Sequence, residues 1–322
     1  MARSGTDGIM KLAITGDCRP ALVVDGRVVD IGEAAGAVTP PKYRMPELIA
    51  GLSAGTIDLS KISQQAGVPI GAARLGAPLL RPGKILVALS NNRENVDAPA
   101  GPVSIAMKSP SSILEPGGTV VLPRAAAVVF HHEAQLAVVI GKGGKNIPAD
   151  RALDHVFGYC GAINIAARGL GFGMGINTDS FDTFTPLGPV IVTADEFDDV
   201  RNLRLALSVN GEPREDYAIS DLLHPIEDLI AFASRLAALE PGDVILTGAC
   251  YQGVGPVQDG DVLELGIDGI GTLRANVSDA LARRWPTGVD AGVAEAARSA
   301  RLGRGPIPFR TASVVQLDQE VL

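Results

Sequence analysis

The chain has 322 residues, of which 46% are hydrophobic, and its formal net charge is −8 at pH 7. A chain of this size can bury one large core or two smaller ones. No basic block is present to neutralise phosphates, which argues against a nucleic-acid partner. The uninterrupted apolar runs are also shorter than the roughly 20 residues that a membrane helix needs, so no membrane partner is expected.

The three cysteines, Cys18, Cys160 and Cys250, are widely spaced and odd in number. They form neither a disulfide framework nor a zinc-binding spacing, which indicates a reducing compartment. The first residues also lack the apolar core of a signal peptide. The sequence therefore predicts a cytoplasmic protein. Because nucleic-acid and membrane partners are not expected, the predicted partner is a small-molecule substrate.

Short apolar segments predict strands at the start of the chain. These strands are expected at residues 10–14, 21–24 and 27–31. Asp25-Gly26 has the composition of a hairpin turn. A helix is expected over residues 42–66, and the prolines at 78 and 82 indicate a boundary. We therefore predict a small N-terminal α/β cap domain that covers residues 1–80.

Beyond this boundary, segments rich in Val and Ile alternate with Gly and Pro, which predicts a mainly β body over residues 81–279. Strands are expected at residues 85–89, 128–142, 203–209, 244–248 and 261–265. Residues 220–239 are the strongest helix candidate because their apolar residues recur at helical spacing. A C-terminal segment, residues 280–322, is expected to hold a helix near 293–302 and a tail. The predicted fold class is α+β, mainly β.

Polar residues open the predicted strand 128–142. His131, Glu133 and Gln135 alternate along it and should share one face, with His132 on the other. Glu133, beside an apolar run, is a candidate acid or base. His131 is either a replacement base or metal ligand, or a histidine that only bonds to a neighbour. Both interpretations of His131 stay open.

Ten segments that occur in one order between residues 80 and 278 carry a family resemblance. They are Pro82–Ile85, Met107–Ser112, Glu133–Gly141, Gly158-Tyr159, Ser180–Phe184, Pro186–Pro189, Val209–Glu212, Leu239–Gly248, Gly253–Gly255 and Ile267–Gly271. Together they resemble the fumarylacetoacetate hydrolase family. The resemblance implies a twisted β-roll body, usually a homodimer, and a bound Mg²⁺ or similar ion. It also implies hydrolysis, decarboxylation, tautomerisation or hydration of 2-oxo acids and 1,3-dicarbonyl acids.

The metal positions that the resemblance implies are altered here. Only Glu133 is a carboxylate, whereas Gln135 and Asn164 stand where the family has two more. Divalent hard cations prefer anionic oxygen, so two amides should weaken binding severely. We therefore expect either no cofactor or weakly bound Mg²⁺ or Mn²⁺. Gln135 and Asn164 are then expected to orient a carbonyl group or a water molecule.

The catalytic positions that the resemblance implies also differ. Asn95 and Ala98 replace the His–Glu pair that activates water in the family, and Asp179 replaces a lysine. Arg168 is retained. The predicted catalytic residues are Glu133 and His131, and the predicted substrate-binding residues are Asn95, Lys108, Gln135, Asn164, Arg168, Asp179 and Thr247. The alternating glycines from 169 to 175 are interpreted as a loop beside the pocket.

Three functional hypotheses follow. The first is an enzyme that acts on a small oxo acid, 1,3-dicarbonyl or related intermediate by acid/base chemistry of the lyase, isomerase or cyclase type. The second is a non-catalytic ligand-binding or assembly protein that kept the fold. The third is a metal-dependent hydrolase or decarboxylase with relocated ligands such as His131 and Asp179.

Overall fold

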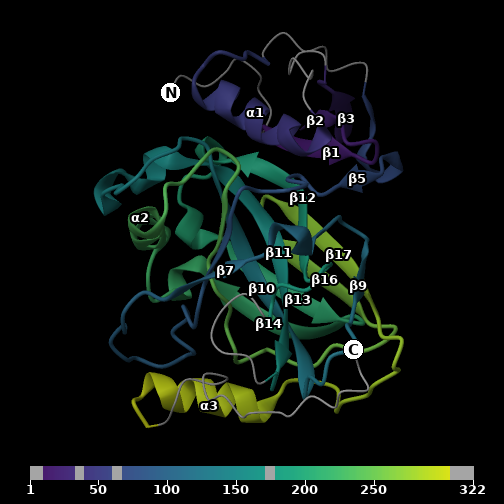
Figure 1. The fold of residues 1–322 in the computed structure, drawn as a ribbon, viewed down its shortest axis with the longest axis vertical. Helices are drawn as coiled ribbons and strands as arrows, with labels where there is room; N and C mark the ends of the chain where they lie inside the picture. Colours follow the sequence, from purple (N-terminus) through teal and green to yellow (C-terminus); the bar gives the residue numbers. More distant parts are fainter. Residues whose placement is uncertain (1–9, 33–39, 60–66, 171–177, 305–322) are drawn as a thin grey trace.

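The computed structural model describes residues 10–32, 40–59, 67–170 and 178–304 (Figure 1). Its larger sheet contains β1 (Lys11–Thr15), β2 (Pro20–Val24), β3 (Arg27–Asp30), β4 (Val68–Pro69), β5 (Leu75–Gly76), β6 (Ile85–Ala88), β7 (Ile105–Lys108), β8 (Ile113–Leu114), β10 (Val129–Ile140), β11 (Val156–Arg168), β12 (Thr185–Thr193) and β15 (Val244–Leu246). Its smaller sheet contains β9 (Thr119–Val121), β13 (Arg204–Val209), β14 (Glu212–Ala218), β16 (Val262–Ile267) and β17 (Gly271–Ser278). Short 3-10 turns lie at 70–72, 110–112, 149–155, 194–196, 200–202 and 219–221. The predicted mainly β fold with few helices is confirmed.

The strand β10 lies at the centre of the molecule, and all twelve of its residues are buried. It pairs with β11 along its whole length and with β15 near its end. Leu136 and Val138 pack with the smaller sheet, whereas Ala137 and Val139 pack with helix α1 (Pro41–Ser53) on the other face. Burial on both faces explains why this strand ends in an unbroken apolar run.

The N-terminal strands continue the larger sheet instead of forming a separate one. The strand β1 pairs with β12, and β2 and β3 follow outward in the order β12-β1-β2-β3-β4. Helix α1 (Pro41–Ser53) covers these strands at the top of Figure 1. The proposed domain boundary near residue 80 therefore falls within one continuous sheet and stays a prediction.

Helix α1 is shorter than the sequence predicted. It ends at Ser53, and Gly55 adopts a positive φ of 69°, a conformation that stops a helix and suits glycine. The prediction of helix over residues 54–59 is therefore wrong. Residues 60–66 lie outside the described part of the chain.

Helix α2 (Ile226–Leu236) buries Ile226, Leu229 and Ile230, as their spacing predicted. It is shorter than the predicted range of 220–239 because Pro225 stands at its N-cap, and the residue before a proline disfavours helical backbone. Helix α3 (Ala291–Arg301) also forms where a helix was expected, and it lies at the end of the molecule opposite α1 (Figure 1).

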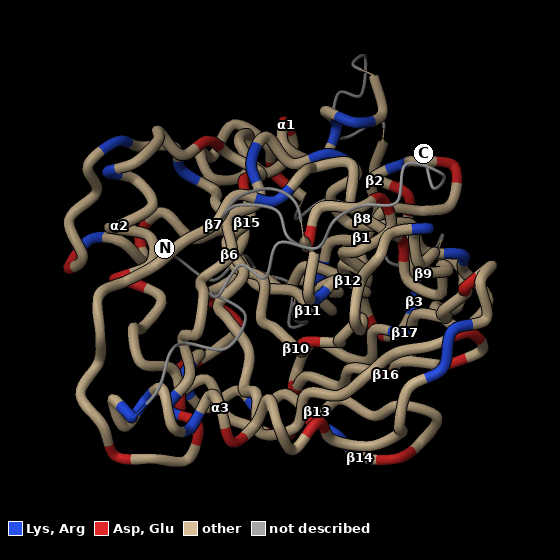
Figure 2. Tube along the Cα trace, turned by 60° about the horizontal axis from the view of Figure 1, so that its bottom comes forward, with Lys and Arg blue, Asp and Glu red and all other residues tan. Residues whose placement is uncertain are grey.

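Within the described ranges, no helix is long and apolar enough to cross a membrane. Figure 2 shows acidic and basic residues interspersed along the trace, α3 included.

Candidate active site

The register between β10 and β11 brings the predicted site residues onto one face. Glu133 lies opposite Asn164, and His131 lies opposite Ala166, two residues before Arg168. Residues that face each other across an antiparallel pair share a side of the sheet, and alternation extends that side to Gln135 and Arg168. The shared face of His131, Glu133 and Gln135 is thereby confirmed.

The carboxylate of Glu133 is buried and fully hydrogen-bonded. Arg168 Nη2 donates to its Oε1, and Asn164 Nδ2 donates to its Oε2 at 2.8 Å. Gln135 Nε2 donates to the same Oε2 at 3.1 Å, and Gly248 N donates to Gln135 Oε1 at 3.0 Å. Burial acts to lower the pKa of Arg168, but the charge and hydrogen bond of Glu133, together with the charges of Tyr251 and Asp179, outweigh it and raise that pKa.

Lys108, at the end of β7, is the second cation of this buried network. Its Nζ donates to Asn164 Oδ1 and to the carbonyl oxygen of Phe184 at 2.9 Å. Burial lowers the pKa of Lys108 to about 8, although the charges of Asp179 and Glu133 act in the opposite direction. Asp179 Oδ2 lies 3.5 Å from Asn164 Nδ2. The structure thus brings Lys108 and Asp179 to Asn164.

The three family metal positions do not fit Mg²⁺ or Mn²⁺. Each side-chain oxygen of Glu133, Gln135 and Asn164 accepts a hydrogen bond from a protein donor. Only Glu133 is anionic, and the two cations Arg168 and Lys108 bond directly to this set. A divalent cation there would find only one carboxylate among these three side chains and would meet the like charges of Arg168 and Lys108.

The third hypothesis required a metal site built from other residues. Among residues 10–32, 40–59, 67–170 and 178–304, no group of three or more His, Cys, Asp and Glu side chains could hold a metal. Relocated ligands such as His131 and Asp179 are therefore not supported within these ranges.

The side chains of two adjacent histidines on β10, His131 and His132, point to opposite faces of the sheet. His131 Nε2 lies 3.2 Å from Asp290 Oδ2, just before α3. Burial, followed by the charge of Arg168, lowers the pKa of His131 to about 4, so His131 is neutral at pH 7. His132 Nδ1 lies 2.9 Å from Glu215 Oε1 on β14. His132 therefore points toward the smaller sheet, as alternation predicted.

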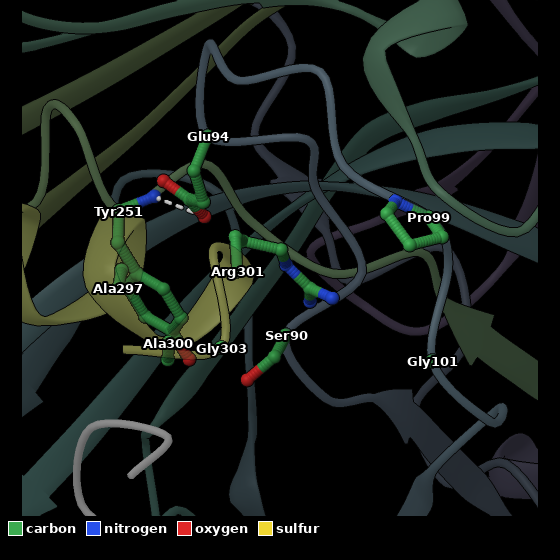
Figure 3. A pocket seen from close by; sticks show the side chains of 9 residues that line it. All are labelled: Ser90, Glu94, Pro99, Gly101, Tyr251, Ala297, Ala300, Arg301 and Gly303. Carbon is green, nitrogen blue, oxygen red and sulfur yellow. Dashed lines mark hydrogen bonds between the residues drawn. The ribbon is translucent and has the colours of Figure 1, made fainter. Parts of the chain in front are cut away.

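A cavity of about 200 Å³ lies between the β6–β7 loop, residues 89–104, and α3 (Figure 3). Ser90, Glu94, Pro99, Gly101, Tyr251, Ala297, Ala300, Arg301 and Gly303 line it. Sequence reasoning missed this cavity. Two signals were available: Glu94 is the only carboxylate between Ser90 and Asn95, and Arg301 closes the predicted C-terminal helix.

Glu94 is the ionisable residue of the β6–β7 loop that lines the cavity. Its Oε1 accepts from Tyr251 N at 3.1 Å, and its Oε2 accepts from Gln252 Nε2 at 3.0 Å. Burial raises the pKa of Glu94 above its ordinary value, although these hydrogen bonds and the charge of Arg301 oppose the shift. A carboxyl group with a raised pKa is a common acid or base in active sites.

The cavity and the buried network meet at Tyr251. The ring of Tyr251 lies 6.0 Å from Arg168 Cζ on one side, and Tyr251 lines the cavity on the other. The nine lining residues do not include the predicted site residues Lys108, His131, Glu133, Gln135, Asn164, Arg168 and Asp179. Most predicted site residues therefore lie outside the cavity lining, and Tyr251 connects the two groups through its contact with Arg168.

The last two predicted binding residues, Asn95 and Thr247, do not line the cavity. Asn95 is exposed at a turn with a positive φ of 58°, a conformation that asparagine tolerates. The Thr247 hydroxyl is buried without a hydrogen-bond partner among the described residues, and its carbonyl accepts from Asn91 Nδ2 at 2.9 Å. The predicted loop at 169–175 lies mostly outside the described residues.

Comparison with known proteins now gives these features a family. The family described as fumarylacetoacetate (FAA) hydrolase, C-terminal, matches residues 83–278. The chain belongs to the fumarylacetoacetate hydrolase family. Helix α3, which ends at Arg301, and its N-cap residue Asp290 lie beyond the matched range.

Relatives with named activities cover much of the chain. It is 33% identical over 275 residues to maleylpyruvate hydrolase of Aquipseudomonas alcaligenes, covering 78% of this chain and 93% of the relative. It is 38% identical over 216 residues to a mitochondrial oxaloacetate tautomerase of Homo sapiens, covering 61% and 67%.

Solved structures show the same fold. Maleylpyruvate hydrolase from Sphingobium sp. SYK-6, in complex with manganese(II) and pyruvate, matches with a TM-score of 0.76 at 32% identity, covering 84% of this chain and 99% of that one. 5-Carboxymethyl-2-hydroxymuconate delta-isomerase from Mycobacterium smegmatis matches with a TM-score of 0.67 at 31% identity, with the same coverage of 84% and 99%. Members named as enzymes thus include hydrolases, tautomerases and isomerases.

Proposed function

We propose that this protein is an enzyme that moves a proton on a small oxo acid, in a tautomerase or isomerase reaction that needs no divalent ion. The carrying observation is Glu94, a buried carboxyl group with a raised pKa that lines a cavity of about 200 Å³. The tautomerase and isomerase relatives support the reaction class. The donor set at Glu133, Gln135 and Asn164 supports independence from a metal.

In the proposed reaction, Glu94 removes a proton from the carbon next to the oxo group. The electron pair of the C–H bond forms the carbon–carbon double bond of an enolate, and the C=O electrons move onto oxygen. Protonated Glu94 then returns the proton to that oxygen or to another carbon. The isomer has the same atoms as the substrate, so no co-reactant is required. The Ser90 hydroxyl lines the same cavity and supplies a hydrogen-bond donor for the enolate oxygen.

The buried network supports this site from behind. Arg168 stays fixed by Glu133 and faces the ring of Tyr251, a residue of the cavity lining. Rigid support of this kind holds reacting groups in productive geometry. Proton transfer by Glu133 or His131 stays a prediction, as does the homodimer expected from the family.

Hydrogen–deuterium exchange tests the proposal without knowledge of the natural substrate. Metal-stripped protein is incubated in D₂O with pyruvate or oxaloacetate, and the C3 proton signal is followed by NMR. An enzyme that enolises oxo acids must wash deuterium into C3 faster than buffer alone, and a chelator must not slow it. Absence of catalysed exchange from both acids would reject the proposal.

The non-catalytic hypothesis is favoured by one observation: every oxygen at the three family metal positions already bonds to the protein. A ligand-binding protein would be stabilised by an oxo acid, because ligands that bind only the folded state raise the melting temperature. Stabilisation without catalysed exchange would select that hypothesis.

A further inference from the structure

We infer that Arg301 of helix α3 binds the carboxylate group of the substrate, and that this C-terminal helix therefore determines which acids the site accepts. The inference rests on the proposed function and adds a binding residue outside the range that matches the family. Figure 3 shows Arg301 reaching from α3 between Glu94 and Ser90, while Tyr251 lies beside Ala297 of α3.

The first argument concerns positive charge. Arg301 is the only cation among the nine residues that line the cavity. Arg168 and Lys108 do not line the cavity: Arg168 bonds Glu133, and Lys108 bonds Asn164 and the Phe184 carbonyl oxygen. A substrate carboxylate in this cavity needs a charged donor, and a planar guanidinium matches a carboxylate with two parallel hydrogen bonds.

The second argument concerns the position of α3, which is attached to the body at its start. Asp290 Oδ1 accepts from Val293 N at 3.1 Å and so caps the helix. Asp290 N donates to the Val254 carbonyl oxygen at 2.8 Å, and Asp290 Oδ2 lies 3.2 Å from His131. The first turn is therefore tied directly to β10.

A second attachment joins α3 to Glu94 itself. The side-chain amide of Gln252 donates to Glu94 Oε2 and to the Ala294 carbonyl oxygen, both at 3.0 Å. Arg298 Nη2 donates to Gln252 Oε1 at 2.6 Å. One side chain thus links the proposed base to two turns of α3, so that Glu94 and Arg301 are held in a fixed relation.

The third argument concerns size. Ala297 and Ala300 line the cavity with small side chains and leave room beside Arg301. A volume of about 200 Å³ is below the roughly 300–1,000 Å³ of pockets for drug-sized ligands. The cavity therefore suits a short acid whose carboxylate meets Arg301 while its oxo-bearing carbons lie beside Glu94.

Calorimetric titration of the full chain with oxalate and with pyruvate tests this inference. Arg301→Gln should weaken binding of both anions about 10- to 100-fold, the range for a lost hydrogen bond to a charged group. Arg301→Lys should recover only part of the affinity, because an ammonium lacks the planar fork. Arg304→Gln is the matched control: Arg304 is exposed just beyond α3 and does not line the cavity. It should bind as the wild type does.

Methyl pyruvate, which lacks the negative charge, should bind the wild type and Arg301→Gln equally. Equal affinity of wild type and Arg301→Gln for pyruvate would overturn the inference, as would failure of the wild type to bind either anion. Deuterium exchange separates the two proposals. If Arg301→Gln exchanges C3 protons with unchanged KM, only the role of Arg301 fails; if the wild type exchanges none, the proposed function fails.

Discussion

Two regions of this molecule hold ionisable groups, and they differ in how much room those groups have. The network around Glu133 on β10 and β11 lies inside the family match, and each side-chain oxygen of Glu133, Gln135 and Asn164 accepts a hydrogen bond from the protein. The cavity beside Glu94 is hollow, and three of its nine lining residues, Ala297, Ala300 and Arg301, belong to α3, beyond that match. The first region can hold a structure together, whereas the second can admit a substrate.

Under the proposed function, the family site would keep its architecture while its chemistry changes. Gln135 and Asn164 are amides, and the cations Arg168 and Lys108 bond directly to Glu133 and Asn164. In this proposal, the network around Glu133 acts as a rigid support and not as an ion site. The reacting groups are then expected at the new boundary between the β6–β7 loop and α3.

The largest effect should come from removing the proposed base. Glu94→Gln keeps the shape but cannot accept a proton, so catalysed exchange should fall about 10²- to 10⁴-fold. The rate of deuterium exchange with pyruvate measures it. Glu47→Gln on α1, exposed at the opposite end of the molecule, is the control and should leave the rate unchanged. A fully active Glu94→Gln would place the chemistry back at Glu133 or His131.

The pH dependence of the deuterium-exchange rate also tests whether Glu94 is the base. A base works only when deprotonated, so the rate should fall as the pH drops through the pKa of Glu94. Burial raises that pKa, so the acid limb should lie above the ordinary glutamate value of 4.5. This limb should disappear from the residual activity of Glu94→Gln. An acid limb that the variant retains would assign it to another group.

The buried network should reveal itself through stability. Glu133→Ala leaves Arg168 buried without its carboxylate partner, and breaking a buried pair costs about 3–5 kcal/mol of the free energy of unfolding. Urea denaturation measures this loss. The exposed pair of Arg204 and Asp216 offers the control: Asp216→Ala should change stability little. A similarly small loss for Glu133→Ala would remove the distinction between the two regions.

Restoring the family carboxylates should sharpen the comparison further. Gln135→Glu combined with Asn164→Asp returns two anionic oxygens beside Glu133, so Mn²⁺ should then raise the melting temperature. Binding at 100 times Kd adds about 2.7 kcal/mol, and the neighbouring Lys108 should lower this gain. The wild type should show no rise. A rise in the wild type would contradict the account of its metal positions.

The smallest effect concerns the link between the regions. Gln252→Ala removes the amide that joins Glu94 to α3, and each lost hydrogen bond costs about 1 kcal/mol. Amide hydrogen exchange of residues 291–301 should accelerate, while that of β10 should not. Equal protection of α3 in variant and wild type would show that other contacts hold the helix.

The sequence predicted the faces of β10 because side-chain alternation in a strand is independent of the rest of the fold. It also placed α2, because Ile226, Leu229 and Ile230 repeat at helical spacing. It predicted α1 too long, since Gly55 ends that helix within an otherwise compatible stretch. The family pattern located Glu133, Asn164 and Arg168, but not the hydrogen bonds that saturate them.

The cavity could not be read from the sequence because its lining joins distant segments. His131 meets Asp290, and Glu94 shares a cavity with Arg301, through tertiary packing that no local pattern encodes. The exposed position of Asn95 likewise follows from the turn that the loop makes. Local chemistry thus identified candidate residue types, whereas only the fold showed which of them surround empty space.

A crystal structure of the protein grown with Mn²⁺ and pyruvate, with anomalous data collected at the manganese edge, tests the central claim most directly. The account predicts pyruvate in the cavity, with its carboxylate on Arg301 and its methyl carbon beside Glu94, and no anomalous peak at Glu133. A manganese ion bound by Glu133, Gln135 and Asn164 with pyruvate on the metal would contradict it.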